Sequence, residues 1–317
     1  MTKRRLIGLL IAGILLPLFG YFLWRQLQDI DLAEVWTSAR SVPLAHLLAA
    51  AGFAALSYLC LTGFDFMAVR YAGKPLPYRH VALASFVALS IGHNIGIAAL
   101  SSGAIRYRFY SRLGLTEGDV GRVILFCGVT VGLGLLILAG LAGVLNPSLT
   151  GEILRIEQLV LVRALGVACL ALAGAYLAMA ALVRRPVHIR SWRLQMPPLR
   201  LALGQVVIGP LNFACVAGCL YWCLVALADV GFLGVATAYV IGNLAGVVSH
   251  VPGGLGVLEG VVLVLLPGST VAGGLLVFRA IYFLVPLALG APLFGIIELF
   301  RLGRRTSSGQ GDATAPG

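Results

Sequence analysis

Long stretches of apolar residues without any Asp, Glu, Lys or Arg recur along this sequence and constrain its fold more than any other feature. An α-helix needs about 20 consecutive apolar residues to cross the hydrocarbon core of a bilayer. Runs of about this size are found at Leu6–Trp24, Ser41–Phe64, His80–Ile105, Val123–Gly151, Ala164–Val183, Leu201–Ala228, Val230–Leu258, Gly260–Phe278 and Ala280–Ile297. The chain is therefore predicted to be an integral membrane protein with many spans.

The composition supports this prediction and excludes several other classes of protein. Hydrophobic residues make up 60% of the chain and charged residues 11%, whereas a soluble domain has roughly 45–50% and 25%. A soluble enzyme, a disordered chain and a secreted disulfide scaffold are thereby excluded. Cys215, Cys219 and Cys223 share one helical face, but no His or acidic residue joins them, so we interpret them as packing residues. Neither a metal site nor a cofactor is expected.

Basic residues set the expected orientation. Lys3, Arg4 and Arg5 precede the first apolar run, and Arg304 and Arg305 follow the last one. Cytoplasmic segments carry the excess of Lys and Arg, so both termini are predicted to be cytoplasmic. The first run is longer than the apolar part of a typical signal peptide and lacks a convincing cleavage site, so it is interpreted as an uncleaved helix.

The run His80–Ile105 is predicted to enter and leave the membrane on the cytoplasmic side. Basic clusters flank both of its ends, and a single crossing would place one of them outside. About 26 residues are too few for two full spans but enough for a re-entrant hairpin. Gly92 and Gly96 lie mid-run, where a helix breaks most easily, and are the predicted break.

Residues 231–267 are predicted to form a second hairpin, which enters from the outside and breaks at Pro252, Gly253 and Gly254. The expected fold is thus an all-α polytopic membrane protein with about six full transmembrane helices and two oppositely oriented re-entrant hairpins, or about eight hydrophobic helical segments. Several residues of the two hairpins match at a constant offset of 150, including Gly92 with Gly242. Inverted repeats with broken helices are typical of transporters. Residues 1–305 are assigned to the membrane domain and 306–317 to a short disordered cytoplasmic tail.

Charged residues inside the apolar runs are the best functional clues, because each costs roughly 2.5–3.5 kcal/mol at the bilayer centre. Glu259 and Arg279 are both expected roughly 12–14 Å below the outer surface, so an ion pair between them is predicted. It could be a structural lock or could couple to a substrate or to protons. Asp65 lies in the cytoplasmic third, at a depth that Arg106 could reach.

Four neutral polar residues accompany these charges near the two predicted breaks. They are His93, Asn94, Asn243 and His250. Such residues either fill space with their hydrogen bonds satisfied or line a polar path, and the pattern alone leaves both interpretations open.

Basic and aromatic residues alternate between Gly103 and Arg112. Arg106 and Arg108 are suited to phosphate oxygens, and Tyr110 to headgroup depth. A topological anchor is the simpler interpretation of this segment. Nucleic acid is not an expected partner, because the segment lies between predicted membrane segments. Thr116 and Asp119 then form a capping-box pattern that predicts the start of a helix.

Four motifs occur together in one order along the chain. They are Gly63-Phe64-Asp65, His93-Asn94-Ile95-Gly96, the segment from Gly103 to Tyr110, and the segment from Ser249 to Glu259 that contains Pro252-Gly253-Gly254-Leu255-Gly256. This pattern resembles the transmembrane flippase half of the lysylphosphatidylglycerol synthase/flippase family, the multiple peptide resistance factors, and the stand-alone relatives of that half. The resemblance covers about residues 6–300.

The resemblance implies a function in lipid transport. Full-length family members make aminoacyl-phosphatidylglycerol with a soluble C-terminal domain and move it to the outer leaflet, which gives resistance to cationic antimicrobial peptides. Only Thr306–Gly317 follow Arg305 here, so aminoacyl transfer is not expected and the chain is not expected to be an enzyme. The expected function is translocation of a polar phospholipid, phosphatidylglycerol or its aminoacyl form, across a bacterial inner membrane. Without an ATP-binding motif, transport would be scramblase-like or coupled to an ion gradient.

The expected site has two parts. Asp65, Arg106, Arg108 and Tyr110 would bind the headgroup, and the translocation path would contain His93, Asn94, Asn243, His250, Glu259 and Arg279. The alternative is a non-transporting membrane subunit that binds anionic lipid headgroups or scaffolds a separate lipid-modifying enzyme. A small-molecule or ion transporter is a further alternative, and a homo-oligomer is an open expectation.

Overall fold

The computed structural model of the chain describes residues 36–37, 40–95, 98–183, 187–189, 192–249, 256–266 and 271–310. Several predictions lie outside these residues: the first helix Leu6–Trp24, the break residue Gly96, His250, and the second break at Pro252, Gly253 and Gly254.

The secondary structure of the described part of the chain is helical, as the sequence predicts, apart from one small β-hairpin. The helices are α3 (Leu44–Tyr71), α4 (Tyr78–Ile95), α5 (Ala98–Tyr110), the 3₁₀ turn η1 (Ser111–Leu113), α6 (Glu117–Leu145), α7 (Pro147–Leu154), α8 (Leu159–Leu182), α9 (Leu199–Leu224), α10 (Phe232–Ser249), α11 (Val257–Leu265), α12 (Val271–Arg279), the π-helical turn η3 (Ala280–Leu284) and α13 (Val285–Gln310). Strands β1 (Val187–Ile189) and β2 (Trp192–Leu194) pair antiparallel, with Val187 opposite Leu194.

Five of the described segments are long and apolar enough to cross a membrane: α3, α6, α8, α9 and the continuous stretch Val271–Phe300. They correspond to five of the six predicted full spans, and the sixth lies outside the described residues. Most of the predicted apolar run Val123–Gly151 lies in α6, which begins at Glu117, where Thr116 and Asp119 form the expected capping box. α13 continues to Gln310 and so includes the start of the segment 306–317 that was assigned to a tail.

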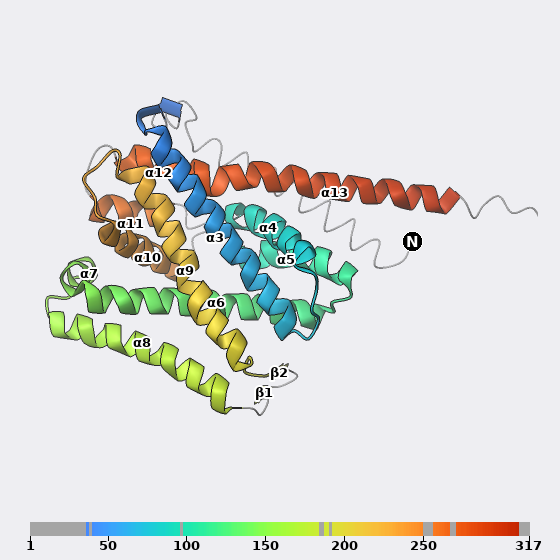
Figure 1. Ribbon diagram of the computed structural model, residues 1–317, viewed down its shortest axis with the longest axis horizontal. Coiled ribbons are helices and arrows are strands. Elements are labelled where there is room, and N and C mark those ends of the chain that lie inside the picture. The colour runs from blue at the N-terminus through green and yellow to red at the C-terminus, as the bar shows by residue number, and fades with distance from the viewer. Residues whose placement is uncertain are drawn as a thin grey trace, which may run out of the picture.

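Glycines bring the spanning helices into close contact, as is typical of helix packing in membranes. A Cβ on Gly134 of α6 would lie 2.7 Å from the backbone of Gly209 on α9, and one on Gly166 of α8 would lie 2.9 Å from the carbonyl of Gly140. α9 packs antiparallel to α3, where Gly218 meets Phe53. These contacts hold the spans in one bundle (Figure 1).

The two hairpins lie at opposite ends of this bundle, as predicted. α4 follows the end of α3, and α5 leads into α6, so the first hairpin opens at that end. α10 follows the end of α9, and α11 leads into α12, whose Gly274 packs against Cys223 in the last turn of α9. Figure 1 shows α4 and α5 at one end and α10 and α11 at the other. The fold is therefore that of a polytopic membrane protein with two oppositely oriented hairpins.

The position of Gly92 corrects the predicted first break. Gly92 lies inside α4, and the helix continues to Ile95. A Cβ on Gly92 would lie 2.8 Å from the Cβ of Ser102 on α5. Gly92 therefore serves the close packing of the two arms, and a glycine needed for packing carries the same sequence signal as one that breaks a helix.

The last span is interrupted by the π-helical turn η3, which the sequence analysis did not predict. Pro286 has no N–H group to donate to the carbonyl of Tyr282, four residues earlier, as an α-helix would require. Side chains from other helices bind the carbonyls of this turn: the hydroxyl of Tyr58 donates to Tyr282 at 3.5 Å, and the amide of Asn94 donates to Phe283 at 3.3 Å. The turn is thus fixed by α3 and α4.

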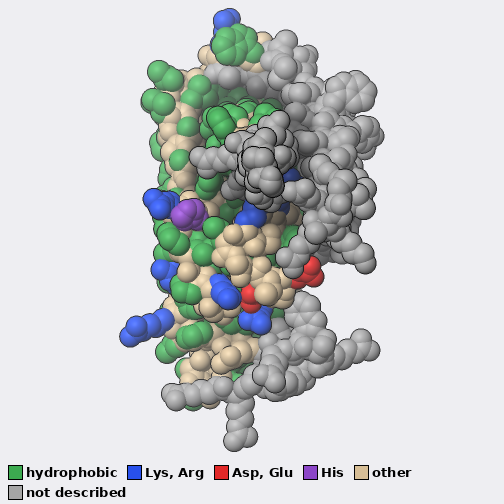
Figure 2. Space-filling model, turned by 90° about the vertical axis from the view of Figure 1, so that its right-hand side faces the viewer, with side chains coloured by type: hydrophobic (Ala, Val, Ile, Leu, Met, Phe, Trp, Pro, Cys, Tyr) green, Lys and Arg blue, Asp and Glu red, His purple; other side chains and the backbone are tan. Residues whose placement is uncertain are grey.

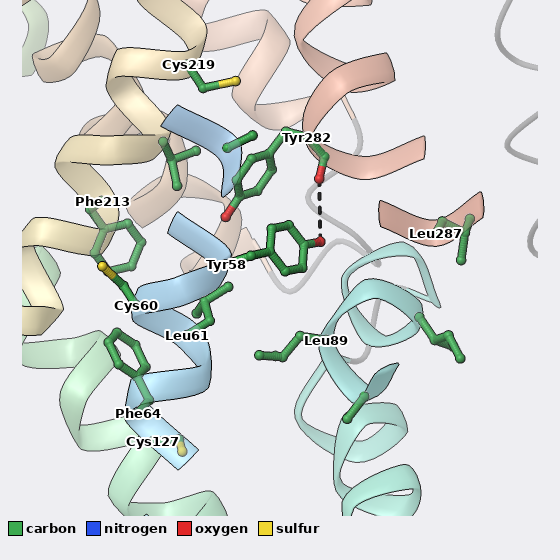
Figure 3. Close-up of a cluster of buried hydrophobic side chains, with 14 of the residues drawn as sticks. Tyr58, Cys60, Leu61, Phe64, Leu89, Cys127, Phe213, Cys219, Tyr282 and Leu287 are labelled. Atoms are coloured by element: carbon green, nitrogen blue, oxygen red, sulfur yellow. Dashed lines mark hydrogen bonds between the residues drawn. The ribbon is translucent and has the colours of Figure 1, made fainter. Parts of the chain in front are cut away.

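The core and the surface differ as expected for a protein surrounded by lipid. Tyr58, Phe64 and Phe213 pack in a buried cluster with cysteines of α3, α6 and α9 (Figure 3). Large apolar side chains also remain exposed on the outside of the bundle, for example Val160 and Leu182 of α8. Lys and Arg side chains gather at the end of the molecule where α3 ends and α6 begins (Figure 2).

Candidate functional site

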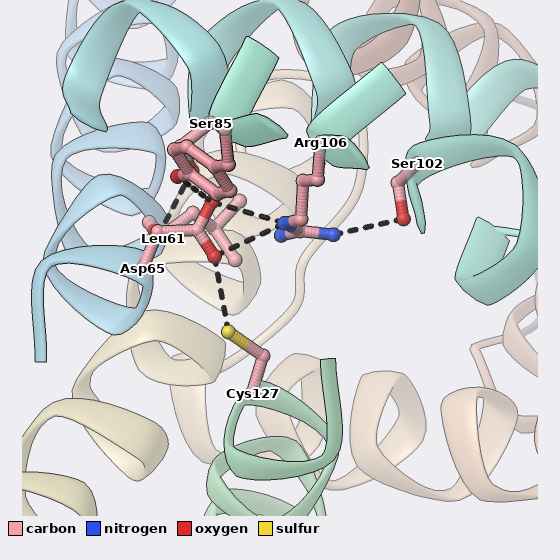
Figure 4. A network of polar contacts seen from close by, with 7 residues as sticks. Leu61, Asp65, Ser85, Ser102, Arg106 and Cys127 are labelled. Atoms are coloured by element: carbon pink, nitrogen blue, oxygen red, sulfur yellow. Dashed lines mark hydrogen bonds and ion pairs between the residues drawn. The ribbon is translucent and has the colours of Figure 1, made fainter. Parts of the chain in front are cut away.

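A buried ion pair joins the first hairpin to α3. The Nε of Arg106 on α5 donates to both carboxylate oxygens of Asp65 on α3, at 3.1 and 3.0 Å, and its Nη1 donates to Ser102 at 2.9 Å (Figure 4). The side chain of Asp65 is fully buried and that of Arg106 is 6% exposed. The predicted contact between Asp65 and Arg106 is therefore confirmed.

Two further groups bind the same carboxylate. The hydroxyl of Tyr110 donates to Oδ2 of Asp65 at 3.2 Å, and Sγ of Cys127 on α6 donates to Oδ1 at 3.0 Å. Both side chains are buried. A buried carboxylate needs this many donors to offset its lost hydration. Asp65 thus connects α3, α5 and α6 at one point.

The surroundings of Arg106 differ from what the alternating pattern suggests. A side chain at the membrane surface would be exposed, whereas Arg106 and Tyr110 are both buried against Asp65. The position of these residues along the chain predicts that they lie near the basic end. It does not predict the direction in which their side chains point, because that depends on where α3 and α6 pack.

Arg108 and Arg112 bind a different carboxylate. Nη2 of Arg108 donates to Oε2 of Glu298 on α13 at 2.6 Å, and Nη1 of Arg112 donates to Oε1 at 2.9 Å. These side chains are partly exposed, Arg112 most of all at 32%. The first hairpin is thereby tied to the last span as well as to α3.

The second hairpin carries its own ion pair. Nε of Arg279, the last residue of α12, donates to Oε1 of Glu259 on α11 at 2.6 Å, which confirms the pairing expected from their equal depth. The other oxygen of Glu259 accepts from the backbone N–H of Gly256 at 2.9 Å and caps α11. Both side chains are half-buried, with exposed fractions of 18% and 19%.

A polar cluster lies at the centre of the bundle and was not singled out from the sequence. The hydroxyl of Ser57 on α3 donates to Oδ1 of Asn212 on α9 at 2.7 Å and lies 2.9 Å from the hydroxyl of Tyr282. Ser57 and Asn212 are each about 20 Å from the ends of their helices. All three are buried. The only signal in the sequence was that Ser57 and Asn212 are polar residues near the middle of apolar runs.

Two predicted path residues, His93 and Asn94, lie beside this cluster. The ring of His93 stacks on that of Tyr282, with centroids 6.4 Å apart and an interplanar angle of 18°. Asn94 is buried and donates to the carbonyls of Ser90 and Phe283. Asn243 is separate from them and donates to the hydroxyl of Tyr239, one turn earlier on α10, at 3.0 Å.

Glu298 and Gln205 are further polar residues that sequence reasoning missed. Gln205 is fully buried on α9, donates to Thr130 of α6 at 2.9 Å and accepts from Tyr176 of α8 at 2.5 Å. It also donates to the carbonyl of Phe126 at 3.2 Å and so ties three spans together. In the described part of the chain, no group of three His, Cys, Asp or Glu side chains is placed to hold a metal ion.

Comparison with known proteins agrees with this architecture. The family model of the lysylphosphatidylglycerol synthase TM region matches residues 5–290. The chain is 32% identical over 290 residues to the uncharacterized protein slr0712 of Synechocystis, covering 90% of each chain. It is 30% identical over 305 residues to the inner membrane protein YbhN of Escherichia coli, covering 94% of this chain and 93% of that one. The chain belongs to the family of the lysylphosphatidylglycerol synthase TM region.

Proposed function

We propose that this member of the lysylphosphatidylglycerol synthase TM region family translocates a polar phospholipid, phosphatidylglycerol or its aminoacyl form, across a bacterial inner membrane. The observation that carries the proposal is the presence of an ion pair at each of two hairpins that enter the bundle from opposite ends. Charges inside a bilayer are costly and mark the routes of polar substrates. Opposed hairpins with broken helices are the architecture of alternating-access transporters.

The outer part of the path would be the pair of Glu259 and Arg279. Arg279 binds Glu259 through Nε, and its terminal nitrogens Nη1 and Nη2 make no hydrogen bond to the described residues. They are therefore suited to a phosphate oxygen, while Glu259 suits the ammonium group of an aminoacyl headgroup. Because both side chains are partly exposed, a headgroup can replace one partner of the pair without unfolding the site.

The inner part would be formed by the first hairpin. Arg108 and Arg112 would receive the phosphate in exchange for Glu298, because both arginines are partly exposed and share this carboxylate. Asp65, Arg106 and Tyr110 would meet the headgroup next, which requires α5 to move away from α3. The buried state of this group then corresponds to a closed conformation.

The basic end of the molecule would face the cytoplasm, with both termini on that side. The family match covers the membrane region alone, and we propose a transporter without aminoacyltransferase activity. Transport would be an equilibration between leaflets or coupled to an ion gradient. A separate lipid-modifying enzyme could supply the substrate.

Leaflet exchange in proteoliposomes tests this function. The purified protein is reconstituted with fluorescent phosphatidylglycerol, and an impermeant quencher is added from outside. We expect quenching well beyond half of the signal, at least a tenfold slower inner-leaflet phase in Arg279→Gln, and an unchanged phase in the control Arg163→Gln. Arg163 is an exposed arginine of the spanning helix α8.

Quenching restricted to the outer leaflet, with phosphatidylglycerol and again with its aminoacyl form, would refute translocation. That result would favour a membrane subunit that binds anionic lipid or scaffolds another enzyme. Uptake or current without any lipid exchange would favour a transporter of small molecules or ions.

A further inference from the structure

The end of α4 carries polar atoms that the described residues leave without partners. Oδ1 of Asn94 and Nδ1 of His93 are both buried, and neither has a hydrogen-bond partner within the described ranges. Asn94 is only 5% exposed. In the interior of a membrane protein, an unpartnered polar atom costs several kcal/mol. Such atoms therefore call for a group that the described residues do not supply.

The orientation of the Asn94 amide is fixed by its neighbours. Its Nδ2 donates to two backbone carbonyls, that of Ser90 at 2.8 Å and that of Phe283 at 3.3 Å. Both acceptors lack hydrogen, so the opposite orientation of the amide would place its oxygen against two oxygens. Oδ1 is therefore an acceptor, and a partner of Asn94 has to be a hydrogen-bond donor.

His93 keeps accessible surface beside this acceptor, since its side chain is only partly buried. Its ring is held by three aromatic side chains, Tyr58, Tyr282 and Phe283, with centroids 6.3 to 6.4 Å away. The ring is thus positioned by packing, and its buried Nδ1 has no hydrogen-bond partner among the described residues. A group that reaches His93 arrives next to the π-helical turn that also binds Asn94.

The depth of this place matches a substrate that crosses the membrane. Asn94 lies about 24 Å along α4 from Tyr78, at the deep end of the first hairpin. Phe283, its partner, lies within the last span and next to Tyr282, which bonds Ser57 at the middle of α3. The neighbouring side chains of Ser57, Asn212 and Tyr282 form hydrogen bonds with one another. In this cluster, the polar atoms without a hydrogen-bond partner among the described residues are therefore those of His93 and Asn94.

We infer that His93 and Asn94 form a headgroup site deep in the bundle, which recognises hydroxyl or ammonium donors rather than phosphate. Asn94 accepts the donor through Oδ1, and the His93 ring supplies the second hydrogen bond. The inference rests on the proposed function in taking a lipid headgroup as the ligand. It goes further in assigning a place where headgroups with donors are distinguished from headgroups without them.

Matched pairs of short-chain lipids test the site by direct binding to purified protein in detergent. Phosphatidylglycerol carries two hydroxyl donors, and phosphatidylmethanol carries the same charge and none. Phosphatidylethanolamine carries an ammonium group with N–H donors, whereas the quaternary ammonium group of phosphatidylcholine has no N–H donor. We expect the wild type to bind the donor-bearing member of each pair about five- to tenfold more tightly.

Three variants separate recognition from packing. Asn94→Leu removes the acceptor, and His93→Phe removes the ring nitrogens while it keeps the aromatic stack. Both should reduce the difference within each lipid pair to less than twofold. Tyr58→Phe removes the hydroxyl that binds the carbonyl of Tyr282 in the same turn and should keep the difference. Should Asn94→Leu fail to fold, His93→Phe still decides the outcome.

Equal wild-type affinity for both members of each pair would overturn the inference and indicate that water alone fills the site. An undiminished preference in folded His93→Phe and Asn94→Leu would overturn it as well. The result is independent of leaflet exchange. Lipid exchange without a preference for donor-bearing headgroups would support the proposed function and overturn this site. A preference for donor-bearing headgroups without lipid exchange would support this site and overturn the proposed function.

Discussion

The two hairpins use the same pair of charges in opposite ways. In the first hairpin the second arm supplies the cation, Arg106, and a spanning helix supplies the anion, Asp65. In the second hairpin the second arm supplies the anion, Glu259, and a spanning helix supplies the cation, Arg279. The first pair is buried with extra donors from Tyr110 and Cys127, whereas the second is half-buried.

This difference in burial indicates that the two ion pairs have different roles. A buried pair with saturated hydrogen bonds holds helices in one arrangement, because separating it exposes uncompensated charge. A half-buried pair contributes little to stability and can exchange its partners with a ligand. In this conformation the ion pair of the first hairpin is thus fixed, and the ion pair of the second hairpin is the one that can exchange a partner with a ligand.

The largest loss of stability is expected from breaking the buried ion pair of Asp65 and Arg106. Arg106→Met leaves the Asp65 carboxylate buried without its cation and should lower the free energy of unfolding by about 3–5 kcal/mol. The double variant Asp65→Leu with Arg106→Met removes both charges and should recover most of that loss. Thermal unfolding in detergent measures both changes. If the single variant were as stable as the wild type, the pair would not be the lock of this hairpin.

A smaller effect should distinguish the packing of the two hairpins. A Cβ on Gly92 would lie 2.8 Å from the Cβ of Ser102, which cannot move without its backbone, whereas one on Gly242 would first meet the flexible end of Leu258. Gly92→Ala should therefore cost about 1–3 kcal/mol, and Gly242→Ala less. Unfolding of the two variants in parallel is the measurement. A reversed order would show that the first hairpin adjusts more easily than its contacts suggest.

At the half-buried pair, stability and function should separate. Glu259→Gln keeps an acceptor for the N–H of Gly256 and loses the charge beside Arg279. It should cost less than about 1 kcal/mol of stability, while leaflet exchange slows at least tenfold. The unfolding temperature and the exchange rate are measured on the same preparation. Loss of stability in proportion to activity would make this pair a structural lock.

The smallest effect is expected where the first hairpin meets α13. Glu298→Gln weakens the contacts with Arg108 and Arg112, which are partly exposed, and should cost about 0.5–1 kcal/mol. Salt screens exposed charges and not buried ones, so this difference should shrink at high ionic strength while that of Arg106→Met persists. Unfolding at two salt concentrations tests the contrast. Equal salt dependence of both variants would contradict it.

Much of the fold could be predicted because bilayer thickness fixes the length of each span. Helix α8 contains nearly all of the predicted apolar run Ala164–Val183, and the first hairpin follows from the basic clusters at both of its ends, which belong on one side of the membrane. The π-helical turn was missed although Pro286 is visible in the sequence. Whether a proline kinks a helix, ends it or widens it depends on which side chains bind the released carbonyl. Here that is Tyr58, from a helix more than 200 residues away.

The candidate site was predictable in its pairs and less so in its surroundings. The depth of a residue in the membrane can be calculated from its position along a helix, and this calculation predicted the pair of Glu259 and Arg279. The direction of a side chain around the helix depends on packing, so the burial of Arg106 and the role of Glu298 were not foreseen. Ser57 and Asn212 meet across α3 and α9, a contact between distant segments that no local pattern marks.

The π-helical turn divides the last span into two rods with different attachments. The rod before the turn carries Arg279, which is bound to the second hairpin, and the rod after it carries Glu298, which is bound to the first. The turn between them, from Ala280 to Leu284, departs from the regular α-helical hydrogen-bond ladder. This span therefore connects the ion pairs of the two hairpins to each other, and its irregular turn lies beside the end of α4, where Asn94 binds Phe283.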